Sequence, residues 1–422
     1  MRRKGCSNPV PVRRIGLGFF RGANDIPYEG HPDVSGLVGT MASMKVLLFA
    51  NTDWYLYNFR LSLAKALRAE GAEVVLISPH GSFGERLKDE GFRWITVPMR
   101  RSSLNPLREF GFLIHLVRLY RSEKPDVVHN FTIKCVVYGA FAARLAGIES
   151  RINAVAGMGY VFSSDARRAW LLRPLVRALL RLALGGRQSR LVLQNPEDHA
   201  TFVASGLVDS DRVRLIAGSG VDVEHFHPME DVAPRDGIFR VLLAARLLWD
   251  KGVREYVEAA RHLKAQGLPI EFLLAGNPDE GNPASVPATV IQAWREEGVV
   301  KVLGHVDHMP ACFRRVDLAV LPSYREGLPK SLIEAAACGL PVIASDVPGC
   351  REAVVQGSTG LLVPSRDTRA LAEAIRFMRD NPEICASMGR AGRDRVLREF
   401  DENIILEKTL DVYRELAAGF ST

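Results

Sequence analysis

Residues 318–345 are the part of the sequence that most constrains the fold. An apolar run at residues 318–321 is followed by a loop with Gly and Pro, an alanine-rich stretch at residues 331–338 and a second apolar run. Short apolar runs bounded by turn residues are typical of buried strands, and the alanine-rich stretch predicts a short helix. Gly339 provides a left-handed C-cap, and Pro341 prevents the helix from continuing. A strand, a loop, a helix and a second strand in this order predict a parallel sheet.

The loop of this segment has the composition of an anion site. Gly327 lets the backbone approach a ligand closely, and Pro329 suits the first helical position because its missing N–H would lack a partner there. The free N–H groups of a helix start can hold a diphosphate. Glu326 lies on the loop and Glu334 about one turn into the helix, so one carboxylate can face ligand hydroxyls. The segment predicts a nucleotide-sugar site, whereas a glutamate pair without this glycine and proline would be an ordinary solvated helix face.

Strands and helices alternate along the chain from residue 44 onward. Strands are predicted at residues 46–50, 73–78, 126–129, 190–194, 239–245 and 271–275, and helices at residues 61–69, from 196 and from 253. Short strands separated by helices predict parallel sheets with right-handed crossovers. A cluster of Gly, Pro and acidic residues at 216–237 separates two halves. We therefore expect an α/β fold with two Rossmann-like, doubly wound parallel-sheet domains facing a cleft, at residues 44–217 and 218–400, and a C-terminal helix at 401–422 that packs back on the first domain.

Residues 1–43 are predicted to lie outside this fold. They contain six Lys or Arg and three Asp or Glu, so they supply +3 of the formal net charge of +7. Four prolines interrupt them, and they lack the apolar core of a signal peptide. We interpret them as a disordered extension or as sequence upstream of a true start at Met44. A basic tether to anionic lipid is the alternative.

Composition narrows the class of protein. A chain of 422 residues is long enough for two domains, and 47% hydrophobic with 24% charged residues is typical of a globular protein. No run approaches the roughly 18 apolar residues that a membrane-spanning helix needs. The six cysteines show neither metal-ligand nor disulfide spacing, which favours the reducing cytoplasm. A pI near 9.1 without interleaved aromatic and basic residues gives little support to nucleic-acid binding.

Glu326 and Glu334 stand in the frame E-G-L-P-x-x-x-x-E-A-x-A-x-G-x-P-V-I-A-S, which resembles the signature of the retaining glycosyltransferases of family four, with the GT-B fold. Residues 244–252 resemble that family's strand-to-helix Arg…Lys-Gly segment, and residues 216–228 its interdomain G-V-D-x-x-x-F-x-P element. The resemblance covers roughly residues 44–420. Three shorter segments resemble a bacterial subgroup that builds capsules, O-antigens and other glycans on undecaprenyl-diphosphate carriers: 101–106, 277–285 and 400–403.

The resemblance implies roles for residues of the second half. Arg246 and Lys251 follow a predicted strand and would neutralise the donor diphosphate. For either residue alone, an ordinary surface position would be the better interpretation. Glu334 is expected to hold ribose hydroxyls, and Glu326 to contact the transferred sugar as a catalytic residue. The full set expected to bind the nucleotide sugar is Arg246, Lys251, Gly327, Leu328, Pro329 and Glu334. No D-x-D element occurs in a fitting place, so we expect neither a metal nor another cofactor.

The first half offers two further catalytic candidates, His129 and Lys134. Many members of the resembled family carry H-x-H here, and this chain has Phe131 at the second place. This departure leaves open which group contacts the donor sugar. A single histidine at the end of a strand is equally well explained as a structural residue.

A basic helix face is predicted in residues 167–187. Arg173, Arg177 and Arg181 recur every four residues, so they share one helix face opposite leucines. The simpler interpretation is a solvated face of a Rossmann helix. The sharper one is a face that rests on an anionic membrane surface and brings the enzyme to a lipid-linked acceptor.

Together these patterns predict a retaining, metal-independent glycosyltransferase. The subgroup resemblance implies a UDP-linked donor, an N-acetylhexosamine, and a saccharide acceptor on polyprenyl diphosphate. The enzyme would be cytoplasmic and peripheral on the inner face of the cell membrane. Two alternatives remain: a non-hydrolysing sugar-nucleotide epimerase of similar architecture, and a catalytically silent scaffold subunit.

Overall fold

The computed structural model describes residues 41–100, 105–155, 167–228, 237–279 and 281–418. Both sheets lie within one compact unit that begins at residue 39. Of the predicted N-terminal extension, residues 1–40 lie outside the described residues. Met41 is buried in the core beside the first sheet, so the packed fold begins slightly earlier than Met44, the predicted boundary.

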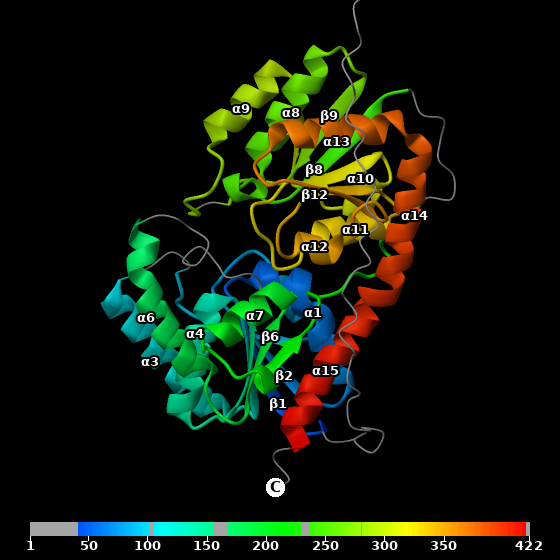
Figure 1. Ribbon diagram of the computed structural model, residues 1–422. Helices are drawn as coiled ribbons and strands as arrows, with labels where there is room; N and C mark the ends of the chain where they lie inside the picture. Colours follow the sequence, from blue (N-terminus) through cyan, green and yellow to red (C-terminus); the bar gives the residue numbers. More distant parts are fainter. Residues whose placement is uncertain (1–40, 101–104, 156–166, 229–236, 280, 419–422) are drawn as a thin grey trace, which may run out of the picture. The chain divides into compact units, whose positions relative to one another are not determined.

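The first half contains a parallel sheet of seven described strands in the order β3-β2-β1-β4-β5-β6-β7 (Figure 1). Its strands are β1 (Lys45–Phe49), β2 (Glu73–Ser78), β3 (Arg93–Thr96), β4 (Val127–Phe131), β5 (Ser150–Val155), β6 (Ser189–Leu193) and β7 (Val213–Leu215). The connecting helices are α1 (Asp53–Ala69), α2 (Gly84–Asp89), α3 (Pro106–Glu123), α4 (Ile133–Ala146), α6 (Arg167–Leu184), α7 (Pro196–Ala204) and the 3-10 turn η1 (Ser210–Arg212).

β1 shows why the central strands are apolar on both faces. Val46 and Leu48 point into the core under α1, and the neighbouring Leu47 and Phe49 point into the core under α3 and α4. Because successive side chains of a strand face opposite sides, a sheet covered by helices on both faces needs this continuous apolar run.

The second half contains a parallel sheet of six described strands in the order β10-β9-β8-β11-β12-β13. Its strands are β8 (Phe239–Ala244), β9 (Ile270–Ala275), β10 (Lys301–Gly304), β11 (Leu318–Leu321), β12 (Val342–Ser345) and β13 (Gly360–Val363). The helical elements are η2 (Trp249–Lys251), α8 (Val253–Ala265), α9 (Ala288–Glu297), α10 (Met309–Phe313), α11 (Lys330–Ala337), α12 (Cys350–Ala353), α13 (Thr368–Asp380), α14 (Pro382–Glu399) and α15 (Glu402–Ala418).

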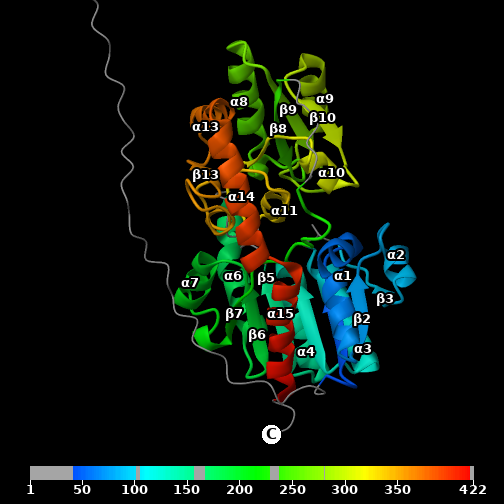
Figure 2. The same ribbon diagram turned by 90° about the vertical axis from the view of Figure 1, so that its right-hand side faces the viewer.

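The closing helix α15 returns to the first sheet (Figure 2). Its apolar residues Ile405, Leu410 and Leu416 share a core cluster with β1 and α1. A buried face of this kind fixes α15 against the first sheet and brings its side chains close to the ends of β4–β6.

The observed sheets confirm the predicted α/β class with two doubly wound parallel sheets. The strand order reverses between β1 and β4 in the first sheet, and between β8 and β11 in the second. Ligands of open parallel sheets bind outside the carboxyl ends of the strands at such switch points. We therefore expect the binding sites at the loops that follow these four strands.

Candidate functional site

The loop between β11 and α11 is held in place by two glycines. A Cβ on Gly252 would lie 2.0 Å from the carbonyl oxygen of Pro322, and one on Gly349 would lie 2.6 Å from the carbonyl oxygens of Glu326 and Gly327. Both glycines have positive φ, +70° and +80°. A larger residue at either position would strain its own backbone and displace the loop.

Glu326 is fixed by two donors. Lys251 Nζ lies 2.5 Å from Glu326 Oε1, and Ser323 Oγ donates to the same oxygen over 2.6 Å. The side chains of Lys251 and Glu326 are mostly buried, so this pair is better shielded from water than a surface ion pair. The structure thus brings together two predicted site residues from the loops after β8 and β11.

Arg246 lies on the same loop as Lys251 but is exposed. Its Nη1 is 2.6 Å from Asp279 Oδ2. Asp279 follows β9, so the guanidinium lies across the carboxyl ends of β8 and β9. The spacing of Arg246 and Lys251 after β8 agrees with a cationic edge, and Asp279 is a partner that the sequence patterns did not single out.

The start of α11 differs slightly from the prediction. Pro329 was predicted to be the first helical residue. It is instead the N-cap residue in extended conformation, and the helix begins one position later, at Lys330. The helix then ends one residue before the predicted end, with Gly339 in the left-handed conformation. No backbone carbonyl among the described residues accepts from the N–H groups of Lys330 or Ser331. These two amides can therefore receive an anion.

Glu334 lies one turn into α11 in a poorly hydrated position. Burial raises the pKa of its carboxyl to about 7, although the nearby Lys330 ammonium opposes that shift. A carboxyl that titrates near neutral pH is unusual for a glutamate and is typical of functional positions.

Lys330 is a candidate that the sequence analysis did not single out. Burial lowers its pKa, opposed by the charge of Glu334, while Arg60 adds to the lowering. Its ammonium lies 5.0 Å from the ring centre of Phe59 on α1. Its place within E-G-L-P-K, directly at the free amides of α11, could have drawn attention to it.

Two residues at the start of α7 contact the loop between β11 and α11. Asn195 Nδ2 donates to the carbonyl oxygen of Gly327 over 3.0 Å, and Arg325 forms an ion pair with the buried Asp198. Asn195 is the N-cap of α7, and Pro196 is its first residue, as predicted. Because each contact sits beside Glu326 or Gly327, α7 helps to fix their backbone.

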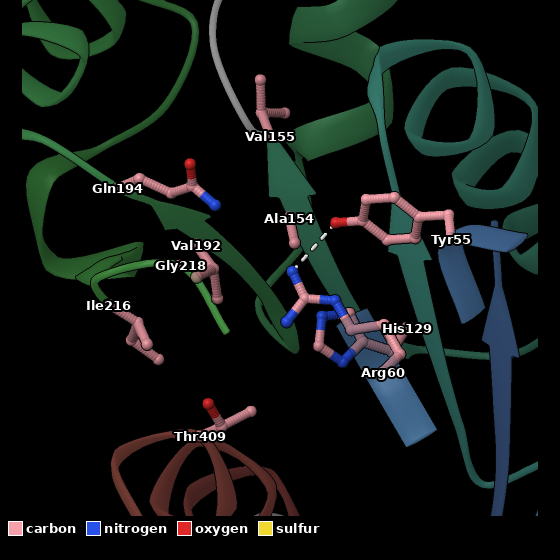
Figure 3. A pocket seen from close by; sticks show the side chains of 10 residues that line it. All are labelled: Tyr55, Arg60, His129, Ala154, Val155, Val192, Gln194, Ile216, Gly218 and Thr409. Atoms are coloured by element: carbon pink, nitrogen blue, oxygen red, sulfur yellow. Dashed lines mark hydrogen bonds between the residues drawn. The ribbon is translucent and has the colours of Figure 1, made fainter. Parts of the chain in front are cut away.

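A second pocket, lined in part by polar residues, lies beside the carboxyl-terminal halves of β4, β5 and β6 (Figure 3). Arg60 and Tyr55 come from α1, His129 from β4 and Thr409 from α15, and Gln194 directly follows β6. Apolar side chains and Gly218 complete the lining of this pocket. None of the ten lining residues is acidic. We call this pocket the Arg60 pocket.

His129 is buried in the middle of β4, not at its end as predicted, because the strand continues to Phe131. Its Nδ1 lies 2.7 Å from the hydroxyl of Tyr413 on α15, and its Nε2 has no partner among the described residues. Burial, followed by the charge of Arg60, holds the pKa of His129 well below its usual value. His129 is therefore neutral at pH 7.

Lys134 occupies a different place. Its Nζ lies 2.9 Å from Glu109 on α3 and 2.6 Å from the carbonyl oxygen of Arg100, and it is not among the residues that line the Arg60 pocket. The structure therefore does not bring Lys134 to His129, and its catalytic role stays a prediction.

The basic face of α6 is described in part. Arg177 and Arg181 are exposed, while Leu180 and Leu184 on the other face are buried. The side chain of Arg173 lies outside what the structure describes. Whether this face meets a membrane stays a prediction.

Within the described ranges, no group of three or more His, Cys, Asp or Glu side chains could hold a metal ion. The helices of that same part of the chain are all too short or too polar to cross a bilayer.

Family models match both halves. One described as "Glycosyl transferase 4-like" matches residues 45–194, and one described as "Glycosyl transferases group 1" matches residues 229–395. The second match contains Arg246, Lys251, Glu326 and Glu334.

Two bacterial enzymes and one solved structure are similar over most of the chain. The N,N'-diacetylbacillosaminyl-diphospho-undecaprenol alpha-1,3-N-acetylgalactosaminyltransferase of Campylobacter jejuni is 27% identical over 380 residues, 88% of this chain and 98% of that enzyme. The UDP-Gal:alpha-D-GlcNAc-diphosphoundecaprenol alpha-1,3-galactosyltransferase of Escherichia coli is 25% identical over 341 residues, 78% of this chain and 86% of that enzyme. Sucrose-phosphate synthase of Thermosynechococcus elongatus shares the fold with a TM-score of 0.74 and 23% identity, over 89% of this chain and 100% of that chain.

Proposed function

Because the chain belongs to the group 1 glycosyltransferases, we propose that it transfers an N-acetylhexosamine from a UDP-linked donor to a saccharide on polyprenyl diphosphate. The two bacterial relatives are named for acceptors on undecaprenyl diphosphate, one for an N-acetylgalactosaminyl transfer and the other for a UDP-linked donor. The product would be a surface glycan such as a capsule or an O-antigen.

The arrangement around α11 is the observation that carries the donor assignment. The free amides of Lys330 and Ser331 directly follow the loop that carries Glu326, the partner of Lys251, and Glu334 follows one turn later. Phosphates prefer the amides of a helix start, and a carboxylate accepts hydrogen bonds from ribose hydroxyls. We assign the diphosphate to the helix start with Arg246 and Lys251, the ribose to Glu334, and the transferred sugar to the side of Glu326.

Transfer proceeds with retention in this proposal. The bond between the sugar C1 and the diphosphate oxygen breaks, and the acceptor hydroxyl bonds to C1 on the same face while its proton goes to the departing phosphate oxygen. Negative charge grows on that phosphate, and we assign its stabilisation to Lys251, Arg246 and the helix amides. Fixed positive groups of this kind can serve where other transferases use a divalent ion, so we propose a metal-independent enzyme.

His129 and the α6 face complete the proposal on the acceptor side. A neutral His129 in the first sheet can donate or accept a hydrogen bond to a substrate, but it cannot supply a positive charge at pH 7. The exposed arginines of α6 are proposed to rest on an anionic leaflet, which would hold a cytoplasmic enzyme beside a lipid-anchored acceptor.

A radiolabelled transfer assay tests this function. The purified protein is incubated with UDP-N-acetylglucosamine, UDP-N-acetylgalactosamine or UDP-galactose and with short polyprenyl-diphosphate saccharides, with and without EDTA. We expect label in the lipid-linked product for one donor, with the anomeric configuration of the donor and undiminished by EDTA. Epimerised UDP-sugar without transfer would favour the epimerase, and inert donors that nevertheless bind would favour the scaffold subunit.

A further inference from the structure

The Arg60 guanidinium is a buried positive charge without a carboxylate partner in the described part of the chain. Arg60 is 8% exposed, and it forms no ion pair with any acidic residue of the described ranges. Its Nη2 donates to the Tyr55 hydroxyl over 2.9 Å, its Nε has no partner there, and its guanidinium lies 4.5 Å from the ring centre of Phe131. Aromatic faces compensate such a charge in part, but an unpaired buried cation remains costly.

His129 adds a second donor to the same pocket. The Tyr413 hydroxyl is buried, and burial raises its pKa well above the usual value, so it keeps its proton. Its hydrogen-bond partner within the described residues is His129 Nδ1, and we assign the hydroxyl as the donor because its proton has no other acceptor there. This assignment places the proton of the neutral imidazole on Nε2, which is buried without a partner among the described residues.

These two side chains make a pocket that offers donors and a positive charge. Figure 3 shows Arg60 and His129 side by side, with Gln194 and Thr409 farther round the lining. The interior is tight and admits a group about the size of a water molecule, such as one phosphate oxygen, and not a whole sugar.

We propose that Arg60 and His129 form a binding site for a phosphate group of the acceptor, with one of its oxygens inserted into the Arg60 pocket. This inference rests on the proposed function, because it takes the acceptor to be a polyprenyl diphosphate. The donor diphosphate already has its own cations and amides around α11, at the second sheet. The Arg60 pocket is lined by strand ends of the first sheet, by α1 and α15, and by Ile216 and Gly218. We therefore assign a phosphate there to the other substrate. Because the charge of Arg60 also acts on Lys330 at the start of α11, the affinity for UDP is a required control.

The kinetic test compares two acceptors that share one saccharide. One carries it on a short polyprenyl diphosphate, and the other carries it on an uncharged alkyl group. In Arg60→Gln the KM for the diphosphate acceptor should rise at least about tenfold, the loss expected for hydrogen bonds to a charged group, while kinetics with the alkyl acceptor stay the same. Arg60→Lys, which keeps the charge but loses the planar fork, should fall in between. Equal losses on both acceptors would overturn the proposal.

A binding experiment separates this inference from the proposed function. Inorganic diphosphate is titrated calorimetrically into protein saturated with UDP, so that the donor site is filled. Wild type should release heat of binding, and Arg60→Gln should not. Arg68→Gln, which removes an exposed arginine two turns later on α1, is the matched control and should bind like wild type. Binding that survives in Arg60→Gln would refute the site. If no acceptor is glycosylated but diphosphate binding depends on Arg60, the acceptor assignment fails and the phosphate site stands.

Two controls test whether Arg60 binds the donor instead or has a structural role. The affinity for UDP itself should be equal in wild type and Arg60→Gln, and a loss there would assign Arg60 to the donor and overturn the acceptor phosphate. The melting temperature of free Arg60→Gln should not fall, because the variant removes an unpaired buried charge. A large fall would mark Arg60 as a structural residue, and Arg60→Lys would then decide between the two roles.

Discussion

Replacing Glu334 with Gln should abolish a pH dependence that the structure predicts for donor binding. Burial raises the pKa of Glu334 to about 7, so at pH 6 most of the protein carries a protonated carboxyl, and at pH 8 most carries a carboxylate. If the carboxylate is the form that accepts the ribose hydroxyls, the apparent affinity for donor falls about tenfold, or about 1.4 kcal/mol, from pH 8 to pH 6. Glu334→Gln has no such titration and should show a flat profile.

The same carboxyl also makes a prediction for stability, with a defined sign. Its pKa is raised in the folded protein, so its contribution is fully favourable below the unfolded value of 4.5 and is lost as the pH rises through about 7. A shift of this size corresponds to about 3 kcal/mol, and we expect about 2 kcal/mol because water still reaches the half-buried side chain. Glu334→Gln should therefore exceed wild type in unfolding free energy at pH 8, with a smaller gap at pH 5.5.

Calorimetric titration with UDP-N-acetylglucosamine at pH 6, 7 and 8 measures the first effect, since the diphosphate diester of that donor does not titrate in this range. Denaturant unfolding at pH 5.5 and 8 measures the second. Glu373→Gln, at an exposed glutamate of α13, serves as the control and should follow wild type in both. The reasoning is refuted if wild type and Glu334→Gln show the same pH profile of donor affinity.

Three other changes test separate parts of the structure. Lys251→Met should lower kcat more than it weakens donor binding, because the negative charge that Lys251 stabilises grows in the transition state. The variant also leaves Glu326 without its cationic partner. Equal losses in kcat and in donor affinity would contradict this prediction. Replacing Arg173, Arg177 and Arg181 together by Gln should weaken binding to anionic liposomes by about 1 kcal/mol for each residue that lies near the surface. Sedimentation with the liposomes measures this loss, and UDP binding should stay unchanged. Thr132→Gly should raise the unfolding free energy by about 1 kcal/mol. Thr132 has φ +73° and ψ 151°, a backbone conformation that is strained for every residue except glycine. An unchanged midpoint of urea unfolding would contradict this prediction.

Local signals were sufficient to predict the signature segment and the more apolar strands, but β3, β5, β7, β10 and β13 were not predicted. β2 covers residues 73–78, as predicted, because an apolar run between a glycine turn and a proline has few other solutions. The start of α1 was missed: it begins at Asp53, eight residues before the predicted helix. Thr52 caps this start, and the Asp53 carboxylate also accepts from the amides of Phe83 and Gly84. An aromatic-rich first turn fixed by such a distant contact carries little helical periodicity of its own.

The burial of Arg60 could not be predicted for a different reason. An arginine in an amphipathic helix is ordinarily solvated, and its position in the pattern of α1 gives no other sign. Its burial depends on Phe131, which belongs to β4, and on Tyr55, one turn earlier. Phe131 stands at the second place of the H-x-H pattern that the resemblance led us to expect. The structure gives this departure a physical correlate, because the ring lies over Arg60 and 4.0 Å, centre to centre, from His129.

Arg60 and Glu334 pose the same energetic problem with opposite signs. Each is a poorly hydrated ionisable group at the carboxyl end of a parallel sheet, and each lacks a strong ion-pair partner among the described residues. A folded protein tolerates such groups at a cost in stability, and a ligand that satisfies them recovers that cost as binding free energy. Hydroxyl donors suit Glu334, and an oxyanion suits Arg60. Donor and acceptor should therefore each raise the melting temperature, and Glu334→Gln should diminish the donor's increment while Arg60→Gln diminishes the acceptor's. A crossed pattern, in which each variant affects the other substrate, would mean that the two groups serve one shared ligand.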